Sequence, residues 1–343
     1  MRLVLLILFT TSIFSKEISF PKDHSFHPDF GLEWCYFVGN LQDDSGKSIG
    51  YELSFFKAKI SEKEEIFPVH FAISNIDEKK HITSQVIERR FGNLAGYNSK
   101  EIYSGDYSVK FLSSTEFQLK AEPRNSKIKL NLLLSISSTS DILLHGEKGY
   151  SLKSRKYPEV FSYYYSIPRL VTKGSIWIEQ KEFIVKSGTS WMDHEWSSQG
   201  KTILNSPRNL SSSENSWDWL CLNLSDGSDL MVFNFRKNAN EEPETFGTLS
   251  NKKEKIYFKD IGSISLVPNG KKWKSGKTKK DYQLNWKIFS KGLELEIAPN
   301  FQEQEFIAIE STGNIYWEGS VQAQGKKDSA IITGKGYLEL KGQ

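Results

Sequence analysis

Apolar and polar residues alternate along much of this chain, and this period of two constrains the fold more than any other feature. Residues 128–132, 282–288 and 293–297 all show it. Successive side chains of a strand point to opposite faces of a sheet, so the pattern, with its β-branched and aromatic residues, predicts half-buried strands. Turn signals such as Asp226-Gly227 separate the predicted strands. No long window has a helical period. We therefore expect an all-β chain built from barrels or sandwiches.

A faint internal repeat divides the chain. An aromatic segment, residues 34–41, ends in Asn-Leu and is followed by a turn and a Phe-rich strand, and residues 217–224 begin a similar unit. Chance similarity between β-hairpins is the alternative explanation. The length of 343 residues suits two domains. We predict a first domain over residues 16–200 and a second over residues 201–343, joined by the Ser- and Asn-rich stretch 197–216 as a linker or long loop.

The N-terminal segment has the pattern of a signal peptide. Met1-Arg2 gives a positive start, residues 3–14 form an apolar run of 12 residues, and the small residue Ser15 follows. A run of this length is too short to span a bilayer as a helix. We predict a signal peptide over residues 1–15 and export to the periplasm, with outer-membrane association as a variant. An uncleaved anchor is the alternative. The net charge of +3 and the absence of a block of like charge predict no nucleic-acid partner.

The chain has two cysteines, Cys35 and Cys221. An exported protein could pair them in a disulfide. They could equally be two small buried side chains. The sequence leaves both readings open.

Three clusters place carboxylates and imidazoles beside large aromatic side chains. They are residues 23–36 (DHSFHPDFGLEWCY), 191–196 (WMDHEW) and 217–219 (WDW). Together they hold three of the six His and five of the nine Trp. Local departures of this kind from an ordinary strand pattern often mark a functional site.

These clusters resemble the signatures of the AttH/carotenoid 1,2-hydratase (CrtC-like) family. The matching stretches are PKDHSFHPDFGLEWCYFVGNL, YYYSIPRLVTKGSI, SWMDHEWSS, WDWLCLNLSDGSDLMVFNFR, YWEG and GKGYLEL, spread over the whole mature chain. The resemblance implies two consecutive lipocalin-like antiparallel β-barrels. The family includes hydratases of carotenoid or isoprenoid double bonds, cyclising relatives, and AttH proteins tied to a membrane transport system. One departure is that Cys35 replaces the second Trp of the family's Glu-Trp-Trp-Tyr, which suggests an altered aromatic wall.

Hydration of an unactivated double bond gives these residues candidate roles. It needs a strong acid, which burial of a carboxyl group can supply, then electron-rich aromatic faces beside the cation, then a base for water. We assign Asp218 as the proton donor and His194 as the base, with Asp193 and Glu195 beside them as catalytic residues. The predicted ligand-binding residues are His24, His27, Glu33, Trp34, Tyr36, Trp191, Trp196, Trp217 and Trp219.

Structural roles compete with each assignment. His194 and its acidic neighbours could form a hydrogen-bond network that closes the barrel interface. Asp218 could pair with Arg169 or Arg236. His24 and His27 could belong to a loop that plugs a barrel, and the aromatic residues could be core.

A metal site is a minor alternative. His24, His27 and His194 with a carboxylate could bind an ion, but the spacing is generic. We expect no metal and no cofactor. The three other histidines, His70, His81 and His145, are isolated in the sequence and are expected at the surface.

Two functions of different kind fit these features. One is an enzyme, a hydratase or isomerase of an isoprenoid-type substrate. The other is a non-enzymatic carrier of a lipid or other hydrophobe, associated with an AttH-type ABC transporter or a membrane surface. A structural protein with plugged barrels is a weaker third reading. We expect a monomer, with its pocket at the seam between the two barrels.

Overall fold

The computed structural model describes residues 17–342, apart from 125, 138–139, 200–214 and 238–239. The predicted signal peptide and most of the predicted linker lie outside the described residues. Strands dominate the described chain, which has one short 3-10 helix, η1 (Lys22–His24), ahead of the first strand. None of the described helical structure is long and apolar enough to cross a membrane.

The first half of the chain folds into one antiparallel sheet, which we call the first barrel. Its strands are β1 (Phe30–Gln42), β2 (Ser48–Ser61), β3 (Glu64–Asn75), β4 (Lys80–Arg89), β5 (Ala95–Asn98), β6 (Glu101–Ser104), β7 (Tyr107–Phe111), β8 (Glu116–Ala121), β9 (Ile128–Ile136), β10 (Leu143–Leu144), β11 (Tyr150–Leu152), β12 (Phe161–Ile178), β13 (Lys181–Val185) and β14 (Ser187–Gln199). Their main order is β4-β3-β2-β1-β14-β12-β9-β8-β7-β6-β5. Because β4 also contacts β5 and β6, the sheet curls into a nearly closed barrel.

The second half forms the second barrel. Its strands are β15 (Ser216–Leu224), β16 (Asp229–Arg236), β17 (Glu244–Ser250), β18 (Lys255–Phe258), β19 (Ile264–Pro268), β22 (Trp286–Ser290), β23 (Leu293–Pro299), β24 (Glu305–Ala308), β25 (Asn314–Lys327) and β26 (Ala330–Lys341). The order is β18-β17-β16-β15-β26-β25-β23-β22-β19, with β24 on β25. A separate short ribbon joins β20 (Trp273–Lys274) and β21 (Asp281–Tyr282). The predicted all-β fold of two lipocalin-like barrels is confirmed.

The internal repeat occupies equivalent positions in the two barrels. In the first, β1 lies between β2 and the closing strand β14; in the second, β15 lies between β16 and the closing strand β26. Strand β1 therefore corresponds to β15. In each barrel the first strand pairs with the last, which is β14 in the first barrel and β26 in the second.

One expected strand is shorter than its pattern. Residues 282–288 alternate throughout, but only Trp286–Ser290 form β22, and residues 283–285 leave the sheet. The side-chain amide of Gln283 donates to the carbonyl oxygens of Asn269 and Asn285, and the indole of Trp286 donates to the carbonyl of Gln283. These local hydrogen bonds hold a turn that the sequence alternation does not reveal.

Each barrel buries the inward-facing side chains of its own strands. The first core contains Cys35, Phe37 and Met192, and the second contains Leu220 and Trp286. The outward-facing side chains of β1, β14, β15 and β16 form a third cluster between the barrels. We call this interface the seam.

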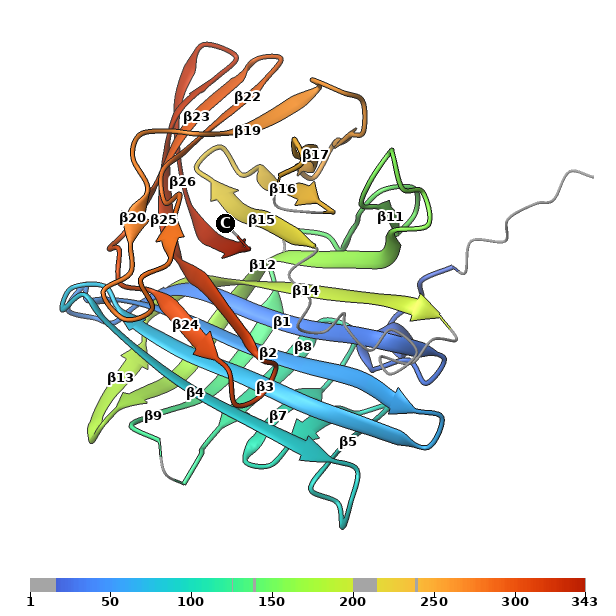
Figure 1. The fold of residues 1–343 in the computed structure, drawn as a ribbon. Coiled ribbons are helices and arrows are strands. Elements are labelled where there is room, and N and C mark those ends of the chain that lie inside the picture. The colour runs from blue at the N-terminus through green and yellow to red at the C-terminus, as the bar shows by residue number, and fades with distance from the viewer. Residues whose placement is uncertain (1–16, 125, 138–139, 200–214, 238–239, 343) are drawn as a thin grey trace, which may run out of the picture.

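The seam is tightly packed. In Figure 1 the second barrel, in yellow to red, lies against the blue and green strands of the first. Arg169 from β12 pairs with Asp229 from β16 at 2.9 Å. On β2, a side chain at Gly50 would collide with the hydroxyl of Tyr337 from β26, so only glycine allows the strands to approach this closely.

An arm of the second barrel extends over the first. Strand β24 packs against β4, and the backbone carbonyl of Ile307 accepts a hydrogen bond from Gln85 at 2.9 Å. Phe306 and Tyr316 stack on each other and on His70 of β3. The arm therefore covers the outer face of β3 at one end of the seam, as Figure 1 shows for β24.

Candidate functional site

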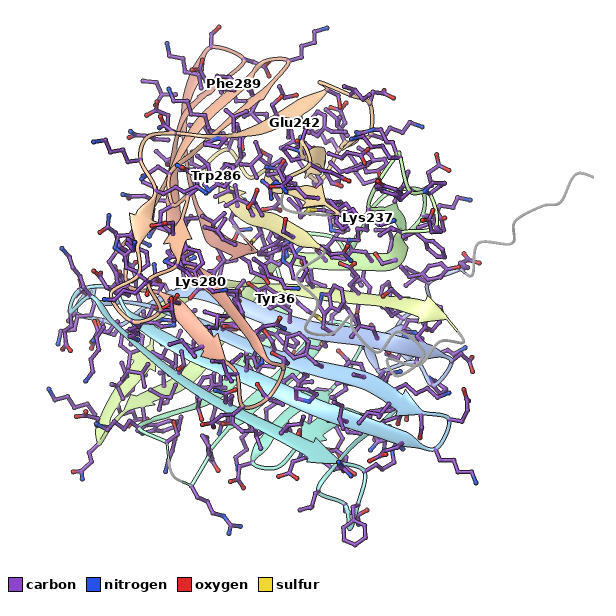
Figure 2. The ribbon with its side chains drawn as sticks, viewed as in Figure 1. Tyr36, Lys237, Glu242, Lys280, Trp286 and Phe289 are labelled. Carbon is purple, nitrogen blue, oxygen red and sulfur yellow. The ribbon has the colours of Figure 1, made fainter. Side chains whose placement is uncertain are left out.

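A cavity of about 370 Å³ lies at the seam between the two barrels. Its walls come from the outer faces of β1, β2, β3 and β14 on one side and of β15, β16, β25 and β26 on the other. Tyr36, which lines the cavity, is labelled between the two sheets in Figure 2. This volume falls in the range of ligand pockets, about 300–1,000 Å³, so the interface between the barrels has room for a small molecule.

Aromatic rings form much of the cavity wall. Trp34, Tyr36 and Phe56 contribute from the first barrel, and Trp217, Trp219 and Phe233 from the second. The rings of Tyr36 and Trp219 meet edge to face across the seam, with centroids 5.4 Å apart. Such a wall binds apolar ligands, and its electron-rich faces stabilise a positive charge on a bound molecule.

Five carboxyl groups also line the cavity: Glu52, Asp193, Glu195, Glu318 and Glu339. Burial raises the pKa of Glu52 to about 8 and that of Glu339 to about 7. Burial, together with the charges of Glu52 and Glu339, raises the pKa of Glu318 well above its usual range. At neutral pH these carboxyl groups are wholly or partly protonated, so the cavity contains neutral carboxylic acids that can donate a proton.

Asp193 is held by a full set of donors. The indole of Trp191 donates to its Oδ1 at 2.6 Å, and the hydroxyls of Ser166 and Tyr164 donate to Oδ1 and Oδ2. Burial raises the pKa of Asp193 to about 7 despite these hydrogen bonds. The carboxyl group is therefore rigidly placed and near the midpoint of its titration at neutral pH.

Two lysines lie at the cavity wall. The ammonium of Lys153 pairs with Glu195 at 2.7 Å and lies over the rings of Tyr164 and Phe233 at 4.7 and 4.8 Å. Lys341 lies over the indole of Trp217 at 4.3 Å. The ammonium group of each lysine therefore lies over an aromatic ring at the edge of the cavity, and that of Lys153 also has a carboxylate partner.

A second polar cluster lies inside the first barrel and not in the cavity. His27 Nδ1 and His194 Nε2 donate to the same oxygen of Glu33, at 2.6 and 2.8 Å, and Lys57 Nζ lies 3.1 Å from the other oxygen. His27 Nε2 donates to Asp23 at 3.0 Å. We call these residues the Glu33 cluster; all are buried.

The Glu33 cluster contains buried groups of opposite charge that stabilise one another. Burial acts to raise the pKa of Glu33, but hydrogen bonds from His194 and His27 lower it to about 2. Hydrogen bonds to Asp23 and Glu33 outweigh burial and raise the pKa of His27. Burial lowers the pKa of His194.

The ligand atoms of His27, Glu33 and His194 lie within 4.8 Å of one another, a separation that a metal ion could bridge. The hydrogen bonds and the nearby ammonium of Lys57 already satisfy this carboxylate. The cluster therefore fits a structural ion network, and the absence of a metal stays a prediction.

His24 lies in the same N-terminal segment as His27 and is also buried inside the first barrel. Its Nδ1 lies 2.8 Å from the hydroxyl of Tyr165, and its Nε2 donates to the carbonyl of Ser114 at 3.1 Å. Burial lowers its pKa to about 4. His24 and His27 thus lie in a segment that fills the end of the first barrel, the alternative that the sequence left open.

Comparison with known proteins now identifies the family. The AttH-like family matches residues 13–343. The chain belongs to the AttH-like family. No curated protein sequence matches the chain. The predicted family resemblance is therefore confirmed, and it covers nearly the whole chain.

Solved structures agree with this assignment. An AttH protein from Nitrosomonas europaea shares 28% identity, with 96% of this chain and 98% of that chain covered and a TM-score of 0.83. Kievitone hydratase from Nectria haematococca shares 12% identity over 95% and 93% of the two chains, with a TM-score of 0.72. CghA in complex with Sch210972 shares 10% over 91% and 89%, with a TM-score of 0.55. The similarities to kievitone hydratase and to CghA show a shared fold and nothing further.

The AttH-like chain divides the predicted site residues among four places, the last of which holds Asp218 alone. The seam cavity receives Trp34, Tyr36, Asp193, Glu195, Trp217 and Trp219. Trp191 packs in the seam cluster beside it. His24, His27, Glu33, His194 and Trp196 lie inside the first barrel. His194 alternates with Asp193 and Glu195 along β14, so its side chain points to the opposite face of that strand.

Asp218 lies on the inward face of β15, whereas its neighbours Trp217 and Trp219 line the cavity. Its carboxylate pairs with Arg236 and accepts from the side-chain amide of Asn234. The structure therefore does not bring Asp218 and His194 together, because each points into a different barrel. This corrects the expectation that they share one pocket.

We predict that Asp218→Asn lowers stability without weakening ligand binding in the AttH-like cavity. The change leaves the guanidinium of Arg236 without its carboxylate, at an expected cost of about 1–3 kcal/mol in unfolding free energy. Urea unfolding and dye binding to the cavity check this. A loss of binding in a folded variant contradicts the placement of Asp218 outside the cavity.

Sequence reasoning did not assign Glu52, Glu318 or Glu339 to the site, although Glu318 and Glu339 lie in the family-like stretches YWEG and GKGYLEL. It also placed three histidines wrongly. His70 is buried and lines the cavity, His145 is fully buried at the seam, where it contacts Thr248 of the second barrel, and His81 is half-buried. The signal that could have found the acids is the alternation itself: Glu318 and Glu339 occupy face positions between apolar neighbours.

Both cysteines are free and buried. Cys35 belongs to the core of the first barrel and Cys221 to the seam, so the structure has no bond between them. The expectation that Cys35 alters the aromatic wall is wrong, because its side chain points into the first barrel, away from the cavity.

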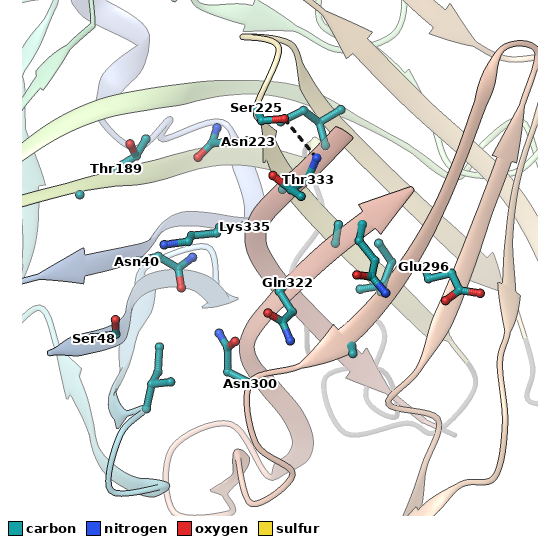
Figure 3. A pocket seen from close by; sticks show the side chains of 18 of the residues that line it. Asn40, Ser48, Thr189, Asn223, Ser225, Glu296, Asn300, Gln322, Thr333 and Lys335 are labelled. Carbon is teal, nitrogen blue, oxygen red and sulfur yellow. Dashed lines mark hydrogen bonds between the residues drawn. The ribbon is translucent and has the colours of Figure 1, made fainter. Parts of the chain in front are cut away.

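A larger cleft of about 680 Å³ lies elsewhere along the seam and is polar. Figure 3 shows amide and hydroxyl side chains there, including Asn40, Asn300 and Gln322. Repeat-related residues Asn40 and Asn223 both contribute. No aromatic residue lines this cleft among the described residues. The aromatic cavity is therefore the better candidate for a hydrophobic ligand.

Proposed function

We propose that this AttH-like protein is an acid-catalysed hydratase or isomerase of a double bond in a hydrophobic small molecule of the isoprenoid type. The observation that carries the proposal is the seam cavity, where carboxyl groups with pKa values raised to about 7 or 8 lie against aromatic rings. Protonation of an alkene needs a neutral carboxylic acid, and the resulting cation needs aromatic faces beside it. The cavity supplies both.

The comparisons support the same chemistry at the level of the fold. Kievitone hydratase, a hydratase by name, shares the fold of this chain over nearly its whole length. The 12% identity carries no residue assignment. The choice between hydration and isomerisation depends on whether water reaches the cation before a neighbouring proton is lost.

We further propose that the protein acts after export, in the periplasm or at the outer membrane. The N-terminal apolar run, residues 3–14, supports this proposal. An association with an ABC transporter belongs to the carrier alternative, in which the same cavity holds a lipid without changing it.

The function is tested by incubating the purified protein with a panel of apolar alkenes in H₂¹⁸O. We expect an alcohol that carries the label, or a shifted double bond. Turnover is expected to fall as the pH rises through the range in which the last protonated carboxyl group of the cavity loses its proton, because the reaction needs a neutral carboxylic acid.

The carrier alternative predicts a different result in the same experiment. Mass spectrometry of small molecules extracted from the protein then finds a bound hydrophobe, and none of the alkenes changes. That outcome contradicts the enzymatic proposal and leaves the cavity as a transport site.

A further inference from the structure

Two of the cavity carboxyl groups differ from the others because they face each other across the seam without a cation. Glu52 comes from β2 of the first barrel and Glu318 from β25 of the second, and they are 1% and 2% exposed. Asp193 has its own donors and Glu195 pairs with Lys153. Among the described residues, no lysine or arginine forms an ion pair with Glu52 or Glu318.

The hydrogen bonds of this pair leave one oxygen available. Oε1 of Glu52 accepts from the hydroxyls of Ser54 at 2.8 Å and Tyr316 at 3.3 Å. Oε1 of Glu318 accepts from the hydroxyl of Tyr36. Oε2 of Glu52 is buried and has no hydrogen-bond partner of normal geometry in the described part of the chain. A carboxylate at Glu52 can therefore accept a proton from a ligand at this atom.

Electrostatics makes the two groups act as a unit. Burial is the largest cause that raises the pKa of each, and the charge of Glu52 raises the pKa of Glu318 further. Two carboxylates this close cannot both ionise easily, so the protons leave in two separate steps. Between these steps the pair holds one proton and has one acid and one base.

We propose that Glu52 and Glu318 form a catalytic carboxyl pair that hydrates an uncharged alkene, with Glu318 giving a proton to carbon and Glu52 taking one from water. This rests on the proposed function and names its substrate class. A substrate with its own carboxylate is disfavoured, because it would bring a second negative charge beside the ionised member of the pair, to which no lysine or arginine of the described residues is ion-paired.

The reaction balances without a cofactor. The carboxylic acid of Glu318 protonates the less substituted carbon of the alkene, which leaves the Glu318 carboxylate and a carbocation. The oxygen of a water molecule forms a bond to the cation and loses a proton to the Glu52 carboxylate. The product is an alcohol. Transfer of that proton from Glu52 to Glu318 then restores the starting pair, so no group is consumed.

The pair also fixes the stereochemistry. Acid and base lie at one place in the cavity, so hydrogen and hydroxyl add to the same face of the double bond. An acid and a base on opposite walls give addition to opposite faces. The structure thus predicts syn addition.

The first test needs no substrate. Infrared spectroscopy follows the carbonyl stretch of protonated carboxylic acids as the pH of the full protein is raised. Asp193 and Glu339 contribute to the same band, so the pair is followed in the difference between the wild type and each variant. We expect the pair to give two separate losses in the wild type. Glu52→Gln and Glu318→Gln should each leave one of these losses, at a pH between the two wild-type steps, because the like charge is gone. If each variant removes one step and leaves the other at its wild-type pH, the groups are independent and the pair is refuted.

The second test uses 1-methylcyclohexene in D₂O. We expect deuterium and hydroxyl on the same face of the alcohol, and a loss of about 100- to 10,000-fold in turnover in Glu52→Gln and Glu318→Gln. Glu305→Gln is the matched control, because Glu305 is buried and hydrogen-bonded to Ser275 and Tyr282 but lies outside the cavity.

The outcomes separate the two proposals. Addition to opposite faces, or full turnover in Glu52→Gln, overturns the carboxyl pair and leaves the hydratase intact. A protein that hydrates no alkene fails the proposed function, and the infrared titration then decides alone whether the two groups share their protons.

Discussion

Replacement of Glu33 by glutamine is expected to lower the free energy of unfolding by about 3–5 kcal/mol. The reason is Lys57, whose side chain is 0% exposed and whose ammonium lies 3.1 Å from the Glu33 carboxylate. Without that carboxylate the ammonium remains inside the first barrel with only the backbone carbonyl of His27 as an acceptor. Urea unfolding followed by tryptophan fluorescence measures the loss.

Two variants control this prediction. Glu33→Gln combined with Lys57→Met removes both charges and should recover part of the lost stability, because no unpaired ion remains. Glu64→Gln breaks an exposed ion pair with Arg89, at 2.8 Å, and should cost about 1 kcal/mol or less. If Glu33→Gln costs no more than Glu64→Gln, the Glu33 cluster does not stabilise the fold.

The dependence of the unfolding free energy on pH in acid tests the same cluster in a second way. The pKa of Glu33 falls from 4.5 in the unfolded chain to about 2 in the folded one. Its contribution is therefore complete above pH 4.5 and is lost as the pH falls to about 2. His24 acts in the same direction, because its folded pKa of about 4 requires the folded state to exclude a proton that the unfolded chain binds below 6.5. The cavity carboxyl groups act in the opposite direction between about pH 8 and pH 4.5, because the folded state binds their protons first. Stability should therefore decline below about pH 4.5.

The fold was largely accessible from the sequence because local alternation and the internal repeat both constrain it. The pattern at 128–132 gives β9, and the repeat at 34–41 and 217–224 gives β1 and β15. The signature residues were harder. The sequence indicates that His194 and Asp193 lie on opposite faces of a strand, but not which face looks into a barrel and which toward the other domain.

The acids at the seam could not be recognised as a group from the sequence, although Glu318 and Glu339 lie in family-like stretches. Glu52 and Glu318 meet only because the outer faces of two barrels pack together, and the hydrogen bond from Tyr36 to Glu318 joins residues 282 positions apart. Period two distinguishes two faces of each strand without showing that the outer faces of two domains become one core. Asp218 and His194 stood out by their aromatic neighbours, yet those neighbours occupy the other face.

Burial at the seam also explains why an isolated histidine was misplaced. His70 lies between the inward-facing Val69 and Phe71 of β3 and therefore points outward, but the arm at β24 covers it, and its Nδ1 lies 2.7 Å from the hydroxyl of Tyr316. Burial lowers its pKa to about 3, so it stays neutral. The covering strand lies more than two hundred positions later in the chain, beyond any local pattern.

Val160→Trp is expected to abolish ligand binding and turnover while the protein stays folded. Val160 lines the seam cavity, is half-buried, and packs against the aromatic seam cluster just before β12. An indole at this position fills space that a ligand needs in a cavity of only about 370 Å³. We expect the affinity for Nile red, a neutral apolar dye, to fall by about 100-fold or more, equivalent to about 2.8 kcal/mol.

The matched control puts the same side chain in the other cleft. Gln322 is exposed on β25 and lines the polar cleft of about 680 Å³, so Gln322→Trp should leave dye binding unchanged. Fluorescence titration of the two variants, with circular dichroism to confirm folding, compares the sites directly. If Gln322→Trp weakens binding and Val160→Trp does not, the hydrophobic ligand occupies the polar cleft and the acids of the seam cavity have another purpose. Because both enzyme and carrier need the same space, this result tests the location of the site independently of its chemistry.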